Sequence, residues 1–387
     1  MAKSIGFIPL RKGSKGIKNK NKRKIAGRPL FSWVLTEALF SELDEVYVFT
    51  DDTEIIDYIK AEYYWNSKIK TVLRSEENAV DTSSTESAIF EFCSNEAISF
   101  DIFCLLQATS PMTTATDINA CLDKIKKDNF TSALTAVKTH RFIWNADGTA
   151  KNYDVFNRPR RQDFEGLLVE NGAVYATKKE ALFESKNRIS GTVGVVAMPE
   201  ETLAEIDSMT DWKIVETLLF ERQKRNKRPN RIDHLVLDVD GVFTDACVYY
   251  DSEGEMAKKF NMRDGMGLEI LRQHDVSVIV ITSENSELVK QRMKKLKIEN
   301  AFFGVKDKYS FLRHFAMDRA ISFNSMAYCG DDVNDLANIC SVGWSFVPQD
   351  AVMEVKPHAD LVLANKSAEG AIRELCEFII KYNQRYE

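Results

Sequence analysis

The chain has 387 residues, of which 44% are hydrophobic and 28% are charged, and its formal net charge is -6. This length exceeds what one ordinary hydrophobic core supports, so we expect a globular protein with two domains. The negative net charge argues against a nucleic-acid partner. No apolar run approaches the ~20 residues that span a bilayer, no apolar leader follows Lys3, and the seven cysteines lack CxxC spacing. We therefore expect a cytoplasmic protein with reduced thiols and no membrane partner.

Short apolar, β-rich runs alternate with amphipathic helical patterns along the first half of the chain. The strand-like runs are 4–10, 45–50, 102–107 and 132–137, and helical patterns lie between them at 29–43 and 85–98. Such alternation predicts an α/β fold with a parallel sheet, in which binding sites form at the carboxyl ends of strands.

A basic segment separates the two halves. A helical stretch ends near Gln223, and residues 222–231 contain six basic residues and a proline but no apolar anchor. We interpret this segment as a helix end followed by a solvated linker, and a docking patch for RNA or phosphate is the alternative. The predicted domains are 1–225 and 233–387, joined by a basic linker at 226–232. A second α/β alternation then runs to a predicted C-terminal helix.

The first candidate site is the loop that follows the first predicted strand. Residues 10–16 read LRKGSKG, which lacks the GxxxxGK(S/T) spacing of a Walker loop. The two glycines let the backbone approach an anion, and Arg11, Lys15 and Lys20 supply positive charge around it. By itself this loop is modest evidence for a nucleotide phosphate site, because lysines near glycines are common on protein surfaces.

Two carboxylates near the end of the first half are candidate metal ligands. Glu205 and Asp207 flank Ile206, and a strand-like alternation would place both carboxylates on one face. Oxygen ligands of this kind suit Mg²⁺, which would neutralise negative charge on bound phosphates. A solvated acidic pair ahead of a helix is the alternative.

These features belong to an ordered series of motifs. The others are Arg74 with DTSST at 81–85, LLQATSP at 105–111, RRQD at 160–163, NGAVY at 171–175, and EID at 205–207 followed by DW at 211–212. In combination, over about residues 3–220, the series resembles the CMP-sialic acid synthetases (N-acylneuraminate cytidylyltransferases) and, more distantly, the CMP-KDO synthetases. The resemblance implies transfer of CMP from CTP to the anomeric hydroxyl of a nonulosonic acid, with release of pyrophosphate.

The resemblance also implies roles for individual residues. The CTP triphosphate would be held by Arg11, Ser14, Lys15, Asn21 and the catalytic candidate Lys20. The cytosine and ribose would be read by Arg74, Ser83 and Thr85. The sugar would be held by Gln107, Tyr175 and, at its carboxylate, Arg161. Mg²⁺ would be coordinated by Glu205 and Asp207.

Two positions depart from this family. Glu205 stands where aspartate is usual, and it is a longer side chain of equal charge. Glu170 precedes Asn171 and Gly172, where the family tends to have a basic residue. One sugar contact is therefore expected to differ, and the sugar stays open among N-acetylneuraminate, KDN, legionaminate and KDO.

The second candidate site begins with LVLDVDGVFTD at 235–245, a predicted strand that ends in paired carboxylates. Three partners follow in order: Thr282 ends a strand-like run, Lys308 opens a helix, and CGDDVND occupies 329–335. Four motifs in this order fit the signature of the haloacid dehalogenase (HAD) phosphohydrolases.

This second resemblance implies a complete phosphatase site. Asp238 would be the nucleophile that forms an aspartyl-phosphate, and Asp240 the general acid and then base. Thr282 and Lys308 would hold the phosphoryl oxygens. Mg²⁺ would be bound by Asp331, Asp238 and the carbonyl of Asp240, with support from Asp332 and Asp335.

The KDO-8-phosphate phosphatases are the most similar group within this superfamily. The signs are a hairpin-like segment at 248–255 and RDGMG at 263–267, with no room for a cap domain between Asp240 and Asp264 or after Thr282. Capless members tend to form tetramers, so a homotetramer through this domain is implied. Glu284 departs from the Gly-Arg that often follows the threonine, and it is expected to alter substrate choice or weaken phosphate binding.

The predicted fold is α/β, with two Rossmann-like parallel-sheet domains: an N-terminal nucleotidyltransferase and a C-terminal capless HAD domain. Our leading hypothesis is a bifunctional enzyme that dephosphorylates a sialic (or KDN-type) acid 9-phosphate and transfers CMP to the free sugar. The alternatives are a cytidylyltransferase whose HAD domain only tetramerises, a CMP-KDO or legionaminate synthetase, and RNA binding through the basic segment.

Overall fold

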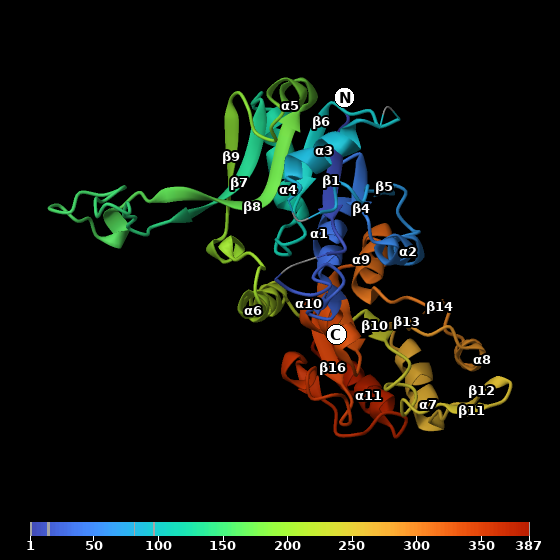
Figure 1. Ribbon diagram of the computed structural model, residues 1–387. Coiled ribbons are helices and arrows are strands. Elements are labelled where there is room, and N and C mark those ends of the chain that lie inside the picture. Colours follow the sequence, from blue (N-terminus) through green and yellow to red (C-terminus); the bar gives the residue numbers. More distant parts are fainter. Residues whose placement is uncertain (1, 14–15, 81, 96, 387) are drawn as a thin grey trace. The chain divides into compact units, whose positions relative to one another are not determined.

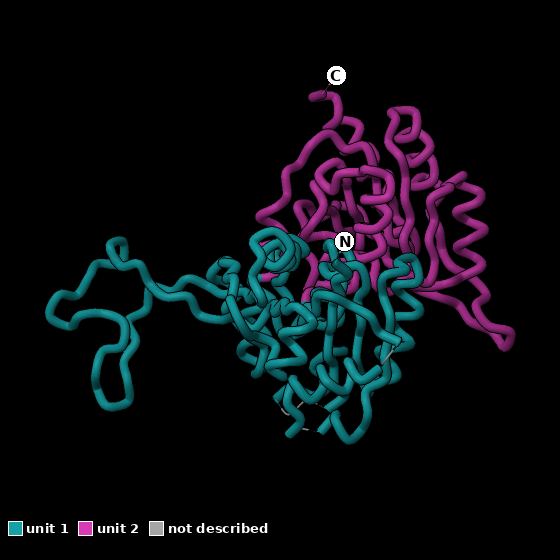
Figure 2. The backbone as a smooth tube through the Cα atoms, turned by 90° about the horizontal axis from the view of Figure 1, so that it is seen from above, with its two compact units in different colours: residues 1–25, 29–218 teal, residues 26–28, 219–387 magenta. Residues whose placement is uncertain are grey.

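The computed structural model describes residues 2–13, 16–80, 82–95 and 97–386 (Figure 1). The chain forms two compact units (Figure 2). Unit 1 comprises Met1–Ile25 and Pro29–Leu218, and unit 2 comprises Ala26–Arg28 and Leu219–Glu387. Each unit is described by itself below.

Unit 1 is built on a seven-stranded sheet with the order β5-β4-β1-β6-β8-β7-β9. Its strands are β1 (Ser4–Leu10), β4 (Glu45–Thr50), β5 (Ile69–Leu73), β6 (Ile102–Leu106), β7 (Ser132–Thr139), β8 (Leu167–Lys178) and β9 (Val193–Met198). β1 pairs in parallel with β4 and β6, and β4 with β5, as the sequence predicts. β8 differs, because it runs antiparallel to both β6 and β7.

Hydrophobic alternation explains how this sheet is covered on both faces. In β1, Ile8 and Leu10 belong to one buried cluster, whereas Ile5 and Phe7 belong to another. The helices of this unit are α1 (Leu30–Leu39), α2 (Thr53–Glu62), α3 (Thr85–Cys93), α4 (Ala115–Lys126) and α5 (Lys179–Ser185). Two short strands, β2 (Lys24–Ile25) and β3 (Arg28–Pro29), form a hairpin ahead of α1.

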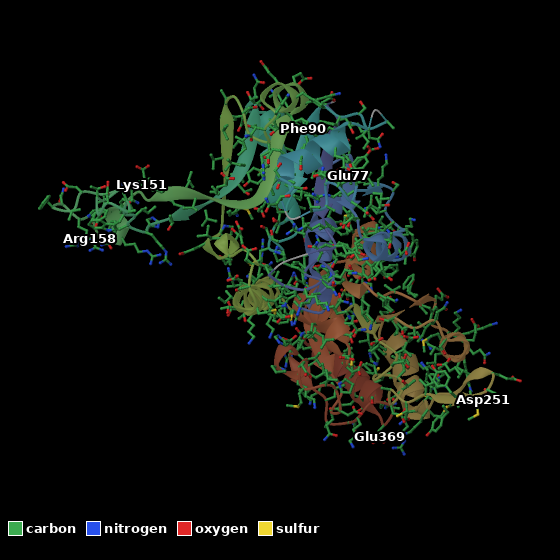
Figure 3. The ribbon with its side chains drawn as sticks, in the orientation of Figure 1. Glu77, Phe90, Lys151, Arg158, Asp251 and Glu369 are labelled. Atoms are coloured by element: carbon green, nitrogen blue, oxygen red, sulfur yellow. The ribbon has the colours of Figure 1, made fainter. Side chains whose placement is uncertain are left out.

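An arm extends from the sheet of unit 1 between β7 and β8 (Figure 1). Lys151 and Arg158 lie on it (Figure 3). The ring of Phe142 packs against that of Tyr153, with 4.3 Å between centroids, and the guanidinium of Arg158 lies 4.5 Å from the Phe142 centroid. A small aromatic and cationic cluster therefore holds the arm together.

Unit 2 contains a six-stranded, fully parallel sheet with the order β14-β13-β10-β15-β16-β17. Its strands are β10 (His234–Leu237), β13 (Ser277–Ile281), β14 (Asn300–Phe302), β15 (Met326–Cys329), β16 (Trp344–Val347) and β17 (Leu361–Val362). Its helices are α7 (Met262–Arg272), α8 (Glu287–Lys295), α9 (Lys308–Asp318), α10 (Leu336–Ser341) and α11 (Ala371–Asn383). A hairpin of β11 (Tyr249–Asp251) and β12 (Gly254–Ala257) occupies the predicted hairpin segment, and the two-domain α/β prediction is confirmed.

The segment between the predicted domains is less solvated than its composition indicates. Helix α6 (Met209–Arg225) continues through the division between Leu218 and Leu219. The side chain of Lys227 is only 8% exposed, because its ammonium pairs with Asp360 and lies 3.3 Å from the Ser345 hydroxyl. The predicted domain limits at 225 and 233 stay predictions.

Among the described residues, no helix combines the length and the apolar character that crossing a membrane requires.

Candidate active sites

A cavity of about 440 Å³ opens in unit 1 where parallel strands end. Arg11 directly follows β1, Arg74 follows β5 and Gln107 follows β6, so the carboxyl ends of three strands from the parallel part of the sheet contribute to it. Eight of the predicted residues line the cavity: Arg11, Lys20, Asn21, Arg74, Ser83, Thr85, Gln107 and the predicted metal ligand Asp207. Ser14 and Lys15 lie outside the described residues.

Arg74 is a largely buried cation at this cavity. Its guanidinium donates to the carbonyl oxygen of Asn78 and lies 5.9 Å from the ring centroid of Phe49. Burial lowers the pKa of Arg74 below its ordinary value, and the charges of Asp51 and Glu91 oppose this effect. Arginine remains protonated even so, and the cavity therefore contains a positioned positive charge.

The loop after β1 packs against the segment that carries the predicted metal ligands. Lys20 Nζ lies 2.9 Å from the carbonyl oxygen of Ile206 and 3.5 Å from Asp207 Oδ1. A Cβ atom on Gly16 would lie 2.3 Å from the carbonyl oxygen of Asp207. The second glycine of the loop is therefore required by a close approach between two backbone segments.

Glu205 and Asp207 are two acidic groups close enough for the charge of one to act on the other. Burial raises the pKa of Glu205 above its ordinary value, Asp207 raises it further, and Lys20 partly opposes both. Residues 204–206 are not in a strand, but the side chain of Ile206 is fully buried between the two carboxylates, so the predicted alternation is present without the strand. This pair of oxygen donors beside a cationic cavity fits a hard divalent cation.

A second group of polar side chains adjoins Glu205. Gly172 has φ +69°, and a Cβ atom there would lie 3.1 Å from Glu205 Oε1 and 3.5 Å from Gln107 Oε1. The Tyr175 hydroxyl donates to the carboxylate of Glu170. Burial raises the pKa of Tyr175, and the hydrogen bond to Glu170 raises it further, so the hydroxyl stays protonated and remains a donor. Glu170, which departs from the family pattern, is therefore bound to the predicted sugar ligand Tyr175.

Arg161 lies apart from this cavity. It begins the short turn Arg161–Asp163 on the arm, its side chain is 77% exposed, and its nearest paired carboxylate, Glu200, is 4.0 Å away. Arg161 does not line the cavity of its own chain. The structure thus brings most of the predicted nucleotide ligands together but not this predicted sugar ligand.

The site in unit 2 is centred on a buried lysine between two carboxylates. Lys308, the first residue of α9, lies 2.7 Å from Asp238 Oδ2 and 2.8 Å from Asp335 Oδ1. Asp238 directly follows β10, as a residue at the carboxyl end of a central strand. Burial raises the pKa of Asp238 to about 7, although the charge of the Lys308 ammonium opposes this effect. The 2.7 Å contact with Lys308 therefore favours the ionised form of Asp238.

Asp335 anchors this arrangement. Its oxygens accept hydrogen bonds from Lys308 Nζ, from the Tyr328 hydroxyl at 2.6 Å, and from the backbone N–H groups of Asp331 and Asp332. These donors occupy its lone pairs, so Asp335 fixes the lysine and the loop around it.

Asp331 faces Asp238 from the loop after β15. Burial raises the pKa of Asp331 to about 8, and the charges of Asp335 and Asp238 add to this effect. Ligand atoms of Asp238, Asp331 and Asp335 all lie within 4.8 Å of one another. The raised pKa of Asp331 reflects more acidic groups in this space than the single ammonium balances, and this oxygen donor set therefore fits a hard divalent cation.

Asp240 has a partner, Lys258, that no sequence motif indicates. Its Oδ1 accepts from Lys258 Nζ at 2.7 Å and from the Thr244 hydroxyl at 3.1 Å. The Lys258 side chain is 2% exposed, and it also lies 3.3 Å from Glu255 of the β11–β12 hairpin. The only signal in the sequence is its position between that hairpin and the RDGMG segment.

Thr282 completes the predicted set. It follows β13, the parallel neighbour of β10, and its side chain is buried. Its hydroxyl oxygen accepts the N–H of Glu284 at 3.3 Å. Glu284, the residue that departs from the family pattern, is exposed beside this strand end.

Together these features define two kinds of phosphorus chemistry on one chain, a nucleotide-type cavity and a carboxylate–lysine phosphatase site. A family model described as Cytidylyltransferase matches residues 5–228, more than half of the chain, and the chain belongs to this family. It is similar to N-acylneuraminate cytidylyltransferase B of Danio rerio, with 33% identity over 98% of this chain and 90% of the relative. It is also similar to the N-acylneuraminate cytidylyltransferase of Oncorhynchus mykiss, with 32% identity over 97% and 88%.

A further relative corresponds to the phosphatase part. The 3-deoxy-D-manno-octulosonate 8-phosphate phosphatase of Haemophilus influenzae is 34% identical over 39% of this chain and 83% of its own length. The solved cobalt-bound form of this phosphatase is 33% identical, covers 40% of this chain and 90% of that one, and has a TM-score of 0.39. Both resemblances inferred from the motifs are confirmed. The chain is an enzyme that joins a nucleotidyltransferase to a HAD phosphatase.

Proposed function

We propose that this enzyme transfers CMP from CTP to the anomeric hydroxyl of a sialic (or KDN-type) acid and also dephosphorylates the corresponding 9-phosphate. One observation carries the proposal: a cationic cavity with an acidic pair and a carboxylate–lysine site occur in one chain, and relatives named N-acylneuraminate cytidylyltransferases match 97–98% of it. Consecutive steps on one sugar give the fusion a chemical purpose, because the tethered sites raise the local concentration of the intermediate.

In the transfer reaction, the anomeric hydroxyl oxygen attacks the α-phosphorus of CTP and gives up its proton to solvent water, a new P–O bond forms, and the bond to pyrophosphate breaks. Arg11, Lys20 and Arg74 would neutralise the charge that develops on the phosphates. Gln107 and Tyr175 would orient the sugar. Mg²⁺, held by Glu205 and Asp207, would supply further positive charge at the phosphates.

In the phosphatase reaction, Asp238 attacks the phosphorus of the sugar phosphate and forms an aspartyl-phosphate, while Asp240 protonates the departing sugar oxygen. Asp240 then takes a proton from the water that hydrolyses this intermediate and releases orthophosphate. Lys308 keeps Asp238 ionised, and with Thr282 it would hold the phosphoryl oxygens. Mg²⁺, held by Asp238, Asp331 and the carbonyl of Asp240, would let the anionic carboxylate approach the anionic phosphate.

We also propose a cytoplasmic homotetramer assembled through the HAD domain. Support comes from the β11–β12 hairpin, which exposes Tyr249, Tyr250 and Met256 by 59%, 71% and 56% (Figure 3 labels Asp251 in the same hairpin). Exposed apolar groups of this kind mark contact surfaces. Arg161 would reach a sugar carboxylate only from another copy or after movement of the arm.

The test is ³¹P NMR of the purified chain with Mg²⁺, CTP and N-acetylneuraminate 9-phosphate. The proposal expects orthophosphate first and then CMP-sugar with pyrophosphate. An Asp240→Asn variant should lose orthophosphate release and still form CMP-sugar from the free sugar. CMP-sugar from free sugar alone, with no orthophosphate from the wild type, would favour the tetramerising scaffold instead. Turnover of KDO with CTP but not of N-acetylneuraminate would favour a CMP-KDO synthetase.

A further inference from the structure

Three residues from the first part of the sequence belong structurally to the phosphatase unit. Ala26, Gly27 and Arg28 lie inside the region that matches the cytidylyltransferase family, yet they cluster with unit 2 (Figure 2). Ala26 and Gly27 form the turn between β2 and β3, with φ +47° and +82°, and Arg28 is the first residue of β3. Two successive residues with positive φ are typical of tight hairpin turns, and such a turn presents the next residue in a defined direction.

Arg28 binds the residue that precedes the catalytic candidate Lys308. Its Nε and Nη2 atoms each lie 2.9 Å from an oxygen of Asp307, and Nη2 also donates to the Ser310 hydroxyl at 2.7 Å. The guanidinium stacks 4.7 Å from the ring centroid of Tyr309. Arg28 and Asp307 are each only 2% exposed. A bidentate, buried pair of this kind fixes both position and orientation.

Asp307 is the N-cap of α9. Its Oδ1 accepts the N–H of Ser310 at 3.2 Å, and Lys308 is the first residue of the helix. The direction in which Lys308 leaves the helix therefore depends on the capping residue that Arg28 holds.

Gly27 contacts the other segment that holds Lys308. A Cβ atom on Gly27 would lie 2.1 Å from the carbonyl oxygen of Val333 and 3.3 Å from Leu336. Val333 begins the short turn that ends at Asp335, the anchor of the lysine. The segment Ala26–Arg28 is thus packed against both the start of α9 and the short turn Val333–Asp335.

We propose that Arg28 is a positioning residue of the phosphatase, which holds Lys308 against Asp238 through Asp307 and the first turn of α9. This inference rests on the phosphatase activity proposed above, although not on which sugar phosphate is the substrate. It implies that the phosphatase is incomplete without residues from the cytidylyltransferase half of the sequence. Arg28 does not touch the substrate and is not a catalytic residue.

The test uses the full-length chain, Mg²⁺ and p-nitrophenyl phosphate, a substrate that needs no sugar recognition. Arg28→Met alone leaves a buried carboxylate unpaired and would destabilise the protein for that reason. The informative variant is therefore Arg28→Met with Asp307→Asn, because it removes both charges together and asparagine still caps a helix. We expect kcat to fall by roughly 10- to 100-fold with little change in KM, since a misplacement of about 1 Å has effects of this size.

Arg272→Met is the matched control. Arg272 is a half-buried arginine of unit 2, less buried than Arg28, and it donates to the carbonyl oxygens of Leu296 and Lys297 at 2.6 and 3.1 Å. Its kcat should equal that of the wild type. An Arg28→Lys variant should lie between the wild type and the double variant, because lysine keeps the charge and loses the bidentate geometry.

A double variant with the kcat of the wild type would overturn the inference. A double variant that unfolds at the assay temperature would also overturn it, because the Arg28–Asp307 pair would then serve folding only. An activity loss in Arg28→Met that the double variant restores would also overturn it. Failure of the proposed function is distinguishable: the wild type itself would release no phosphate from either p-nitrophenyl phosphate or a sugar 9-phosphate.

Discussion

Gly241→Ala should abolish most of the phosphatase activity by displacing Asp331. Gly241 has φ +79°, and a Cβ atom there would lie 1.8 Å from Asp331 Oδ2 and 2.1 Å from its Cγ. Unstrained contacts begin near ~3.5 Å, so the carboxylate or the loop must move by more than about 1 Å. A shift of this size in a proposed metal ligand corresponds to about 100-fold in rate, or ~2.7 kcal/mol of transition-state stabilisation. The left-handed backbone costs alanine a further ~1–2 kcal/mol of stability.

The assay is phosphate release by the full-length chain at increasing Mg²⁺, with thermal unfolding recorded in parallel. Gly148→Ala is the control, because Gly148 has nearly the same φ of +84° and no neighbouring atom within 4 Å of the added Cβ. It should show the backbone strain without the loss of activity. A Gly241→Ala variant with a kcat within about threefold of the wild type and an unchanged Mg²⁺ requirement would contradict this prediction.

Three further predictions concern other parts of the chain. Gly16→Ala should impair CMP transfer by at least ~10-fold, because its Cβ atom would lie 2.3 Å from a backbone oxygen. Gly13→Ala should leave the transfer rate unchanged, because no atom lies within 4 Å of its Cβ, and steady-state kinetics with CTP compare the two variants. Lys258→Met should lower the phosphatase kcat by ~10- to 100-fold by releasing Asp240, and an equal kcat in phosphate-release assays would contradict that role. Burial raises the pKa of Glu45, but hydrogen bonds from two lysines and a tyrosine outweigh burial and lower this pKa to about 2. The contribution of Glu45 to the free energy of unfolding is therefore fully present above pH 4.5 and is lost as the pH falls toward 2. Glu45→Gln should flatten this part of the pH–stability curve in denaturant titrations by about 1 kcal/mol or less, because the pair is near the surface.

Local patterns predicted the elements that position the sites. The predicted strand at 4–10 is β1, and its residues are nearly all buried. Such a strand can be predicted from sequence because a parallel strand covered on both faces of the sheet is continuously apolar. The predicted helix at 29–43 is shorter in the structure, where it spans Leu30–Leu39. Leu43 lies in the loop after the helix, but it is buried in the core. A buried apolar residue gives the same sequence pattern whether it lies in a helix or in a loop, so the pattern extended the predicted helix too far.

Long-range pairs were beyond the sequence patterns. Arg28 and Asp307 are 279 positions apart, and neither belongs to a motif with defined spacing. Lys258 likewise carries no local signature for its contact with Asp240. The antiparallel direction of β8 depends on the arm that precedes it, because a strand's direction follows from its connection and not from its composition.

The buried charges of unit 2 argue against the view that it is only a scaffold. Lys308, Asp238 and Asp335 are each at most 5% exposed, and Asp331 faces them with a pKa raised to about 8. Removing such groups from water costs several kcal/mol per ion, and apolar residues of similar volume fill a core at equal or lower free energy. A tetramerisation module gains nothing from this cost, since its contacts form on the surface. A phosphatase requires it, because the nucleophile must be ionised, oriented and shielded from water, and a cluster with strongly shifted pKa values at a strand end is typical of such a site.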